Sequence, residues 1–336
     1  MLRTSRAWHT KVGRLRLEYI ERDMKELGRD LILFGDCRNT LPLFPEQARM
    51  CVTSPPYYGL RDYGGEEKQV GQEKTPEEYI ETLVEVFSNV RDCLTDDGTL
   101  WLNIGDSYGG TGHMGDWKDP KYKEGRTGHT FALNNKVEGL KSKDLIGIPW
   151  MLAFALRADG WYLRQDIIWH KPNPMPESVK DRCTKAHEYI FLLSKNKHYY
   201  YDNEAIKEPT VTKDNSIRAR DITKLNNTPG RTKMGGLKTN NYDKRNKRSV
   251  WTVTTKPYKG AHFAVFPPDL IEPCILAGSE EGDLILDPFM GSGTTAMVAK
   301  TLGRDYIGCE LHQEYGELIQ KRINDIPIPE PTLFDT

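Results

Sequence analysis

Ser54, Pro55, Pro56 and Tyr57 form a short segment whose chemistry suits a grip on a planar amine. The two prolines fix the backbone and remove two N–H donors, which leaves the Ser54 hydroxyl and the Pro55 carbonyl free to accept hydrogen bonds. Tyr57 can offer a flat aromatic face on which a nucleobase stacks. The segment therefore predicts a site for the exocyclic amine of a base. A proline-rich turn with its tyrosine in the core is the alternative.

A second segment, residues 287–295 with the sequence DPFMGSGTT, has the features of a cofactor-binding turn. Glycine at positions 291 and 293 allows a sharp turn and the close approach of a ligand, and the expected helix after it offers free N–H groups. Glu310 follows the next expected strand, where a carboxylate can accept hydrogen bonds from ribose hydroxyls. The pattern predicts an adenosine-containing cofactor. Because Ala296 fits the looser G-x-G-x-x-A form, a dinucleotide also stays open.

Both segments follow short apolar runs that are typical of buried strands, RMCVT and DLIL. Such runs alternate with helical patterns, which predicts an α/β fold with a mostly parallel sheet and helices on both faces. The polar, glycine-rich stretch 105–143 indicates a loop or lid whose role is open. The expected strands are residues 31–34, 49–53, 98–104, 163–169, 187–194, 283–286 and 305–309, and the expected helices are residues 75–94, 144–158, 268–276, 294–302 and 313–323.

The segment 196–256 interrupts this alternation and is rich in positive charge. Residues 195–259 hold 16 Lys and Arg against 6 Asp and Glu, whereas the rest of the chain holds 31 against 42. A basic insertion on an acidic body is typical of a surface that meets phosphate, and a solvated basic loop is the alternative. The expected divisions are a helical lead-in (1–30), a catalytic domain (31–195 and 257–325), the inserted target-recognition region (196–256) and an extended tail (326–336).

Composition excludes several classes of protein. With 336 residues, 38% hydrophobic and 28% charged, the chain is typical of a soluble globular protein with a sizeable core. No apolar run is long enough for a membrane span, and the basic N-terminus lacks the pattern of a secretory signal. The six cysteines are scattered without a C-x-x-C pair, which favours reduced thiols over disulfides or a zinc site. We therefore expect a cytoplasmic protein that uses no metal.

Taken together, the S-P-P-Y and F-x-G-x-G segments resemble the motifs of amino-methylating DNA methyltransferases, and their order resembles the beta-type arrangement. The resemblance covers roughly residues 31–323. It implies a Rossmann-like methyltransferase sheet, S-adenosyl-L-methionine as cofactor and double-stranded DNA as substrate. The expected reaction transfers a methyl group to the exocyclic N4 of cytosine or N6 of adenine after base flipping. In this family a serine at position 54 favours cytosine N4.

The resemblance also implies roles for individual residues. Phe34-Gly35-Asp36 resembles the element whose acid contacts the cofactor adenine, and residues 262–267 (HFAVFP) resemble the element that packs on its methionine end. Arg164 with residues 167–171 resembles a further segment of the catalytic half. The expected catalytic residues are Ser54, Pro55, Pro56 and Tyr57. The expected cofactor-binding residues are Asp36, Thr53, His262, Phe263, Phe266, Asp287, Pro288, Phe289, Gly291, Ser292, Gly293, Thr294, Thr295 and Glu310. The expected DNA-binding residues of the basic segment are Arg218, Arg220, Lys224, Arg231, Lys233, Lys238, Lys244, Arg245, Lys247 and Arg248.

The implied mechanism needs no covalent enzyme intermediate. Hydrogen bonds from both amine hydrogens, to the Ser54 hydroxyl and the Pro55 carbonyl, would draw the nitrogen out of conjugation and toward the methyl group. Three rivals stay open: a nicotinamide-dependent oxidoreductase, a non-catalytic DNA-binding protein, and a methyltransferase acting on RNA or on protein glutamine. A homodimer and a cognate restriction endonuclease are further partners that the sequence leaves open.

Overall fold

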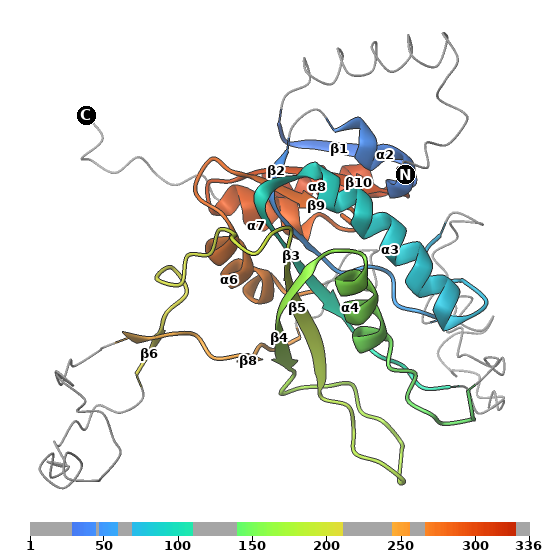
Figure 1. Ribbon diagram of the computed structural model, residues 1–336. Helices are drawn as coiled ribbons and strands as arrows, with labels where there is room; N and C mark the ends of the chain where they lie inside the picture. Colours follow the sequence, from blue (N-terminus) through green and yellow to red (C-terminus); the bar gives the residue numbers. More distant parts are fainter. Residues whose placement is uncertain are drawn as a thin grey trace, which may run out of the picture.

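The computed structural model describes residues 29–44, 47–59, 69–109, 140–210, 244–255 and 266–326, and its centre is an eight-stranded sheet (Figure 1). The strand order is β1-β10-β9-β2-β3-β5-β4-β8. All neighbouring pairs are parallel except those made by β5, which runs antiparallel to β3 and β4. The strands are β1 (Leu31–Phe34), β2 (Ala48–Thr53), β3 (Leu94–Ile104), β4 (Tyr162–His170), β5 (His187–Ser194), β8 (Val250–Thr252), β9 (Leu284–Asp287) and β10 (Asp305–Glu310).

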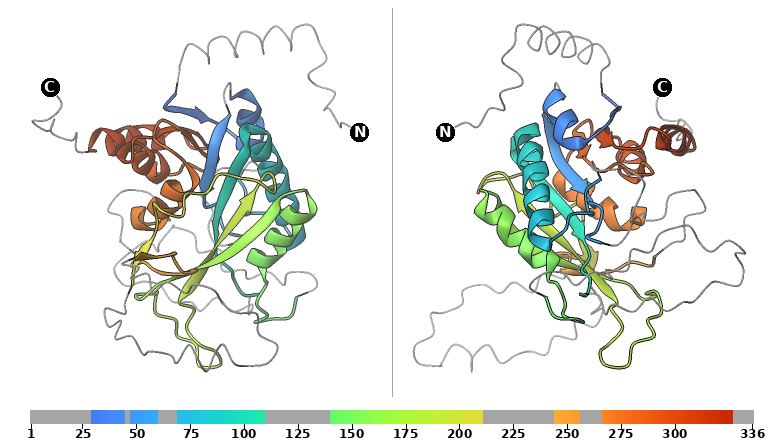
Figure 2. Two further views of the ribbon diagram at one scale, coloured as in Figure 1. Left: turned by 60° about the vertical axis from the view of Figure 1, so that its left-hand side comes forward. Right: turned by 90° about the vertical axis from the view of Figure 1, so that its right-hand side faces the viewer.

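Helices cover both faces of this sheet (Figure 2). Alternate residues of β3 show why: Leu100 and Leu102 pack with α3 and α4, whereas Trp101 between them packs with α6 on the other face. The helical segments are α2 (Cys37–Thr40), η2 (Leu41–Leu43), α3 (Pro76–Cys93), α4 (Ile148–Ala158), α6 (Pro268–Gly278), α7 (Thr294–Thr301) and α8 (Tyr315–Asn324). The expected α/β class and the mostly parallel sheet are confirmed.

The strand order reverses between β9 and β2. From β2 the chain continues to β3 on one side, and from β9 it continues to β10 on the other. In open α/β sheets, ligands bind in the crevice that such a reversal leaves outside the carboxyl ends of the strands. The two segments singled out by the sequence follow β2 and β9, so the topology brings both to the carboxyl ends of the strands at this reversal.

The helix expected over 144–158 begins four residues later, at Ile148. Gly147 has φ of 87°, which places it outside the helix, and Pro149 suits the first turn. The Oδ1 atom of Asp106 accepts hydrogen bonds from the backbone N–H groups of Gly147 (3.0 Å) and Ile148 (3.1 Å). The helix start is therefore set by a carboxylate about 40 residues upstream, which local patterns do not reveal.

The described ends of the 196–256 segment pack with the core of the main sheet, and strand β8 at the C-terminal end joins that sheet. Its strand β8 pairs with β4, and Ile206 and Trp251 are buried in the same core cluster as Trp101. Between these ends, β6 (Glu208–Pro209) and β7 (Lys244–Arg245) form a small antiparallel pair. The apolar residues Ile206 and Trp251 near the two described ends of this segment therefore take part in the core.

The helical lead-in, the expected lid and the extended tail lie wholly or mostly outside the described residues. Among the described residues, no helix combines the length and apolarity that crossing a lipid bilayer requires.

Candidate active site

Asp287, at the end of β9, joins the two segments. Its Oδ1 atom accepts hydrogen bonds from the Thr53 hydroxyl (2.6 Å) and the Phe289 N–H (3.0 Å), and its Oδ2 atom accepts one from the Thr295 hydroxyl (2.6 Å). Thr53 ends β2 and directly precedes Ser54, and β2 and β9 pair in parallel. Asp287 is only 1% exposed. One buried carboxylate therefore fixes the S-P-P-Y loop against the glycine-rich turn.

The glycine-rich turn takes the conformation that its glycines allow. Gly291 and Gly293 have φ values of 54° and 79°. Glu310, at the end of β10, holds the turn: its Oε2 atom accepts from the Gly291 N–H (2.7 Å) and its Oε1 atom from the His312 N–H (2.9 Å). On the other side, Arg322 of α8 donates to the hydroxyls of the turn at 292 and 294. The turn is thus fixed from both sides.

Two acids at this edge have strongly perturbed titration. Burial raises the pKa of Asp287 from 3.8 to about 6, against the hydrogen bonds from Thr295 and Thr53, which lower it. Burial also raises the pKa of Glu310 from 4.5 to about 7, against its backbone hydrogen bonds. Perturbed acids in a crevice mark candidate functional sites.

The loop that follows β2 is held from behind by α3 and the chain before it. The Tyr79 hydroxyl donates to the Pro56 carbonyl (2.8 Å), and a side chain at Gly71 would come within 3.1 Å of the Tyr57 carbonyl. Among the described residues, nothing donates a hydrogen bond to the carbonyl of Pro55. One carbonyl of the loop is therefore engaged, and the neighbouring carbonyl belongs to Pro55, a buried residue.

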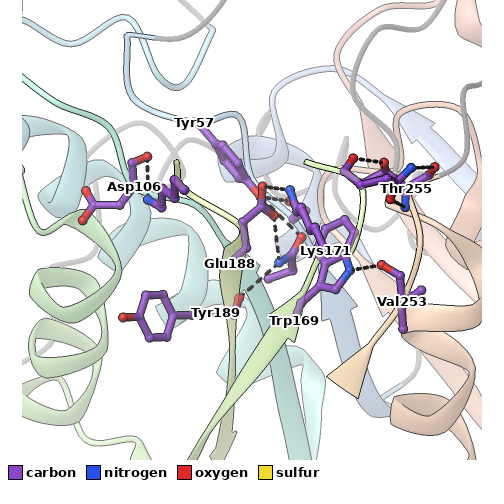
Figure 3. Close-up of polar contacts among 12 residues, drawn as sticks. Tyr57, Asp106, Trp169, Lys171, Glu188, Tyr189, Val253 and Thr255 are labelled. Carbon is purple, nitrogen blue, oxygen red and sulfur yellow. Dashed lines mark hydrogen bonds and ion pairs between the residues drawn. The ribbon is translucent and has the colours of Figure 1, made fainter. Parts of the chain in front are cut away.

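Tyr57 enters a polar cluster that sequence reasoning missed (Figure 3). Its hydroxyl donates to Glu188 Oε2 (2.8 Å) and lies 3.3 Å from Asn103 Oδ1. Lys171 forms an ion pair with Glu188. Gly105 leaves room for the ring, because a side chain there would come within 2.6 Å of it. The one signal in the sequence was a charged residue, Glu188, at the start of an apolar strand.

The DNA methylase family model of N6 and N4 methyltransferases matches residues 48–321. Type II methyltransferase M.SmaI of Serratia marcescens is 50% identical over 294 residues, which cover 87% of this chain and 90% of the relative. The chain belongs to the N6/N4 DNA methylase family. Two solved structures share the fold. PvuII DNA methyltransferase (cytosine-N4-specific) has a TM-score of 0.58, 21% identity and coverage of 90% of this chain and 88% of its own. A putative DNA modification methylase of Thermus thermophilus, complexed with S-adenosyl-L-methionine, has a TM-score of 0.54, 23% identity and coverage of 88% of this chain and 94% of its own.

In this DNA methylase the predicted cofactor residues divide into two groups. In the first group, Phe289 and Gly291 are partly buried at the carboxyl edge of the sheet, and Glu310, 7% exposed, lies at the end of the neighbouring strand β10. The second group is buried and serves the turn itself through internal hydrogen bonds or packing: Thr53, Asp287, Pro288, Ser292, Gly293, Thr294 and Thr295.

Three further predicted cofactor residues have different outcomes. Asp36 caps α2, and both of its oxygens bind the Arg38 guanidinium, so a direct contact with adenine would require that ion pair to open. Phe266 packs against the core on the α6 side of the sheet. His262 and Phe263 lie outside the described residues. Phe34, which belongs to the same predicted motif but was given no contact of its own, is 41% exposed and lies opposite Glu310 in the β1–β10 pairing.

Of the ten predicted DNA-binding residues, the structure describes four. Arg245 and Arg248 both form ion pairs with Glu208, and Lys247 lies over the Trp251 ring at 5.0 Å. Lys244 is exposed on β7. The other six, Arg218, Arg220, Lys224, Arg231, Lys233 and Lys238, lie outside the described residues.

Gly293→Ala is expected to lower the free energy of unfolding by about 2–4 kcal/mol. An alanine at φ of 79° is strained by about 1–2 kcal/mol, and its Cβ would lie 2.7 Å from Ile319 Cγ2. Gly282→Ala is the matched control, since Gly282 has φ of 81° with nothing within 4 Å of the added carbon. Urea unfolding of both variants distinguishes the cost of the strained backbone at positive φ from the cost of the steric clash with Ile319. Equal losses would contradict the packing of α8 against the turn.

Proposed function

We propose that this DNA methylase transfers the methyl group of S-adenosyl-L-methionine to the exocyclic N4 of cytosine in duplex DNA, with adenine N6 as the alternative target. The observation that carries the proposal is the hydrogen bond from Thr53 to Asp287. This bond joins the S-P-P-Y loop to the glycine-rich turn at one edge of the sheet, where the strand order reverses. Methyl transfer needs both there, because the two reactants must be within bonding reach.

The residues at this edge fit an adenosine-containing cofactor. Phe34 offers an exposed aromatic side chain, Glu310 offers carboxylate oxygens for ribose hydroxyls, and Gly291 allows a close approach. The Thermus thermophilus methylase, which shares the fold, is complexed with S-adenosyl-L-methionine. When bound, this cofactor supplies an electrophilic methyl group on a sulfonium.

Ser54 and Pro55 then act on the target base. The Ser54 hydroxyl and the Pro55 carbonyl accept the two hydrogens of the amine, which weakens conjugation of its lone pair with the ring and aims that pair at the methyl group. Tyr57 contributes its ring beside them, where stacking adds about 1–3 kcal/mol per base. This offsets part of the cost of flipping the base out of the duplex, a few kcal/mol.

The preference for cytosine has two supports. A serine stands at position 54, where members of the family that act on adenine favour Asp or Asn. PvuII DNA methyltransferase, named as cytosine-N4-specific, shares the fold. The basic segment supplies the phosphate-binding side chains, so affinity for DNA should fall steeply with salt.

Incubation with methyl-labelled cofactor and duplex DNA, followed by digestion to nucleosides, tests the proposal. We expect the label in N4-methylcytosine. Label in N6-methyladenine would show that the target base is adenine and not cytosine. Unlabelled DNA would refute the methyl transfer.

Cofactor binding is expected to weaken as the pH falls below about 7. In the folded protein Glu310 has a pKa of about 7, so its carboxylate takes up a proton in that range and loses acceptor capacity for ribose hydroxyls. Equilibrium dialysis between pH 5.5 and 8.5 should show about a tenfold loss, and Glu310→Gln should abolish the pH dependence. The exposed Glu317 provides the control variant, Glu317→Gln. A pH-independent wild-type affinity would contradict the role of Glu310.

A further inference from the structure

The cluster behind the S-P-P-Y loop contains a carboxylate that the proposed reaction leaves without a role. Glu188 of β5 receives the Tyr57 hydroxyl at 2.8 Å, and its other oxygen forms the ion pair with Lys171 (Figure 3). The side chains of Glu188 and Lys171 are only 15% and 18% exposed. A charge pair that is largely shielded from water costs free energy to bury, and this pair lies beside the S-P-P-Y loop.

The donors and acceptors in this cluster have a fixed direction. An ionised glutamate can only accept hydrogen bonds, and Lys171 supplies the positive charge that balances it. The Asn103 amide donates to the Tyr189 carbonyl (3.1 Å), which turns its Oδ1 atom toward Tyr57. The single proton of the Tyr57 hydroxyl therefore faces two acceptors. Burial, together with the charge of Glu188, raises the pKa of Tyr57 well above 10, so the hydroxyl keeps that proton.

This direction determines what Ser54 can do. Because Tyr57 donates toward Glu188, the side of its oxygen that faces Ser54 carries lone pairs. Ser54 Oγ lies 3.5 Å from that oxygen, a separation that tightens in many enzymes when substrate binds. The Ser54 proton then points to Tyr57, and the lone pairs of Ser54 are left for the incoming amine.

We propose that Glu188 is a positioning residue that makes Ser54 a hydrogen-bond acceptor for the amine. It does so by setting the direction of the hydrogen bonds that run from Ser54 to Tyr57 and from Tyr57 to Glu188. The assignment rests on the proposed function. If Glu188 served only for packing, replacing it would change stability and ligand affinity. If it acts through the Tyr57 hydroxyl, replacing it changes the rate of methyl transfer, and it does so only in a protein that still has that hydroxyl.

A double-mutant cycle of Glu188→Gln and Tyr57→Phe tests this, measured as the single-turnover methylation rate with saturating cofactor and DNA. Each single variant is expected to slow the reaction about 30-fold, the effect of one lost hydrogen bond to a charged group. The double variant is expected to be no slower than Tyr57→Phe. Cofactor affinity and the fluorescence of a duplex carrying 2-aminopurine at the target, which reports base extrusion, should stay within about twofold. Glu281→Gln, an exposed glutamate at the amino end of β9, is the control.

Several outcomes would overturn the role of Glu188. One is a Glu188→Gln effect of the same size in the Tyr57→Phe background as in the wild type, and another is a wild-type rate for either single variant. Tyr57→Phe keeps the ring and serves even where Glu188→Gln fails to fold. An active wild type with independent effects would sink only this assignment, whereas a wild type that leaves DNA unmethylated would also sink the proposed function.

Discussion

Replacing Ser54 by alanine is expected to lower the single-turnover rate about 100-fold or more while cofactor affinity changes less than about twofold. Under the proposed function the variant removes one of the two acceptors for the amine, and loss of one preorganised group of this kind costs about 10²–10³ in rate. The glycine-rich turn stays intact, because its link to the loop is made by the Thr53 side chain and not by Ser54. Stopped-flow methylation and equilibrium dialysis measure the two quantities separately.

Ser88→Ala is the matched control for this experiment, since it removes a half-buried hydroxyl from the helix α3. Its rate should equal that of the wild type. Parallel loss of rate and cofactor affinity in Ser54→Ala would mean that the serine supports the cofactor turn, and the assigned role would be wrong.

Asp287→Ala is expected to have the second large effect, lowering both cofactor affinity and methylation about 100-fold. Without the carboxylate, two buried hydroxyls and the Phe289 N–H lose their acceptor, which costs about 1–3 kcal/mol for each unsatisfied group. Asp287→Asn keeps an oxygen for Thr53 and Phe289, so it should stay within about tenfold of the wild type. Equilibrium dialysis and rate measurements on Asp287→Ala and Asp287→Asn distinguish the effect of losing the hydrogen-bond acceptor from the effect of losing the negative charge.

The same residue predicts a pH dependence of stability. Its pKa of about 6 in the folded protein exceeds the ordinary value of 3.8, so the folded state binds the proton more tightly than the unfolded state. The contribution of Asp287 to stability should therefore fall as the pH rises from about 4 to about 6 and stay constant above that. Asp287→Asn should lack this slope, and Asp283→Asn, at the other end of the same strand, should keep it. Identical slopes in the wild type and Asp287→Asn would contradict the burial of the charge.

Local patterns in the sequence predicted most of the helices and strands. The strands before Ser54 and Asp287 are short apolar runs bounded by turn residues, and both were placed within a residue or two of their true ends. Positive φ at Gly291 and Gly293 follows from glycine in a tight turn. Such features depend on neighbours in the chain, which is why they can be read without a structure.

The features that sequence reasoning missed depend on distant partners. Asn103 and Glu188 approach Tyr57 from strands 46 and 131 residues away, and no local pattern pairs them. Asp106 sets the start of α4 in the same way. Thr295, predicted as a cofactor residue because it lies in the glycine-rich segment, is buried and donates a hydrogen bond to Asp287. Proximity in sequence to a site does not distinguish a ligand contact from its support.

A crystal structure with a non-transferable amine analogue of S-adenosylmethionine and a duplex containing the target base would test the central claim most directly. We expect the amine of the extruded base within hydrogen-bonding distance of Ser54 Oγ and the Pro55 carbonyl, in one cavity with the analogue held by Phe289 and Gly291. An analogue and a base bound in separate cavities, or an amine held by other groups, would contradict the account.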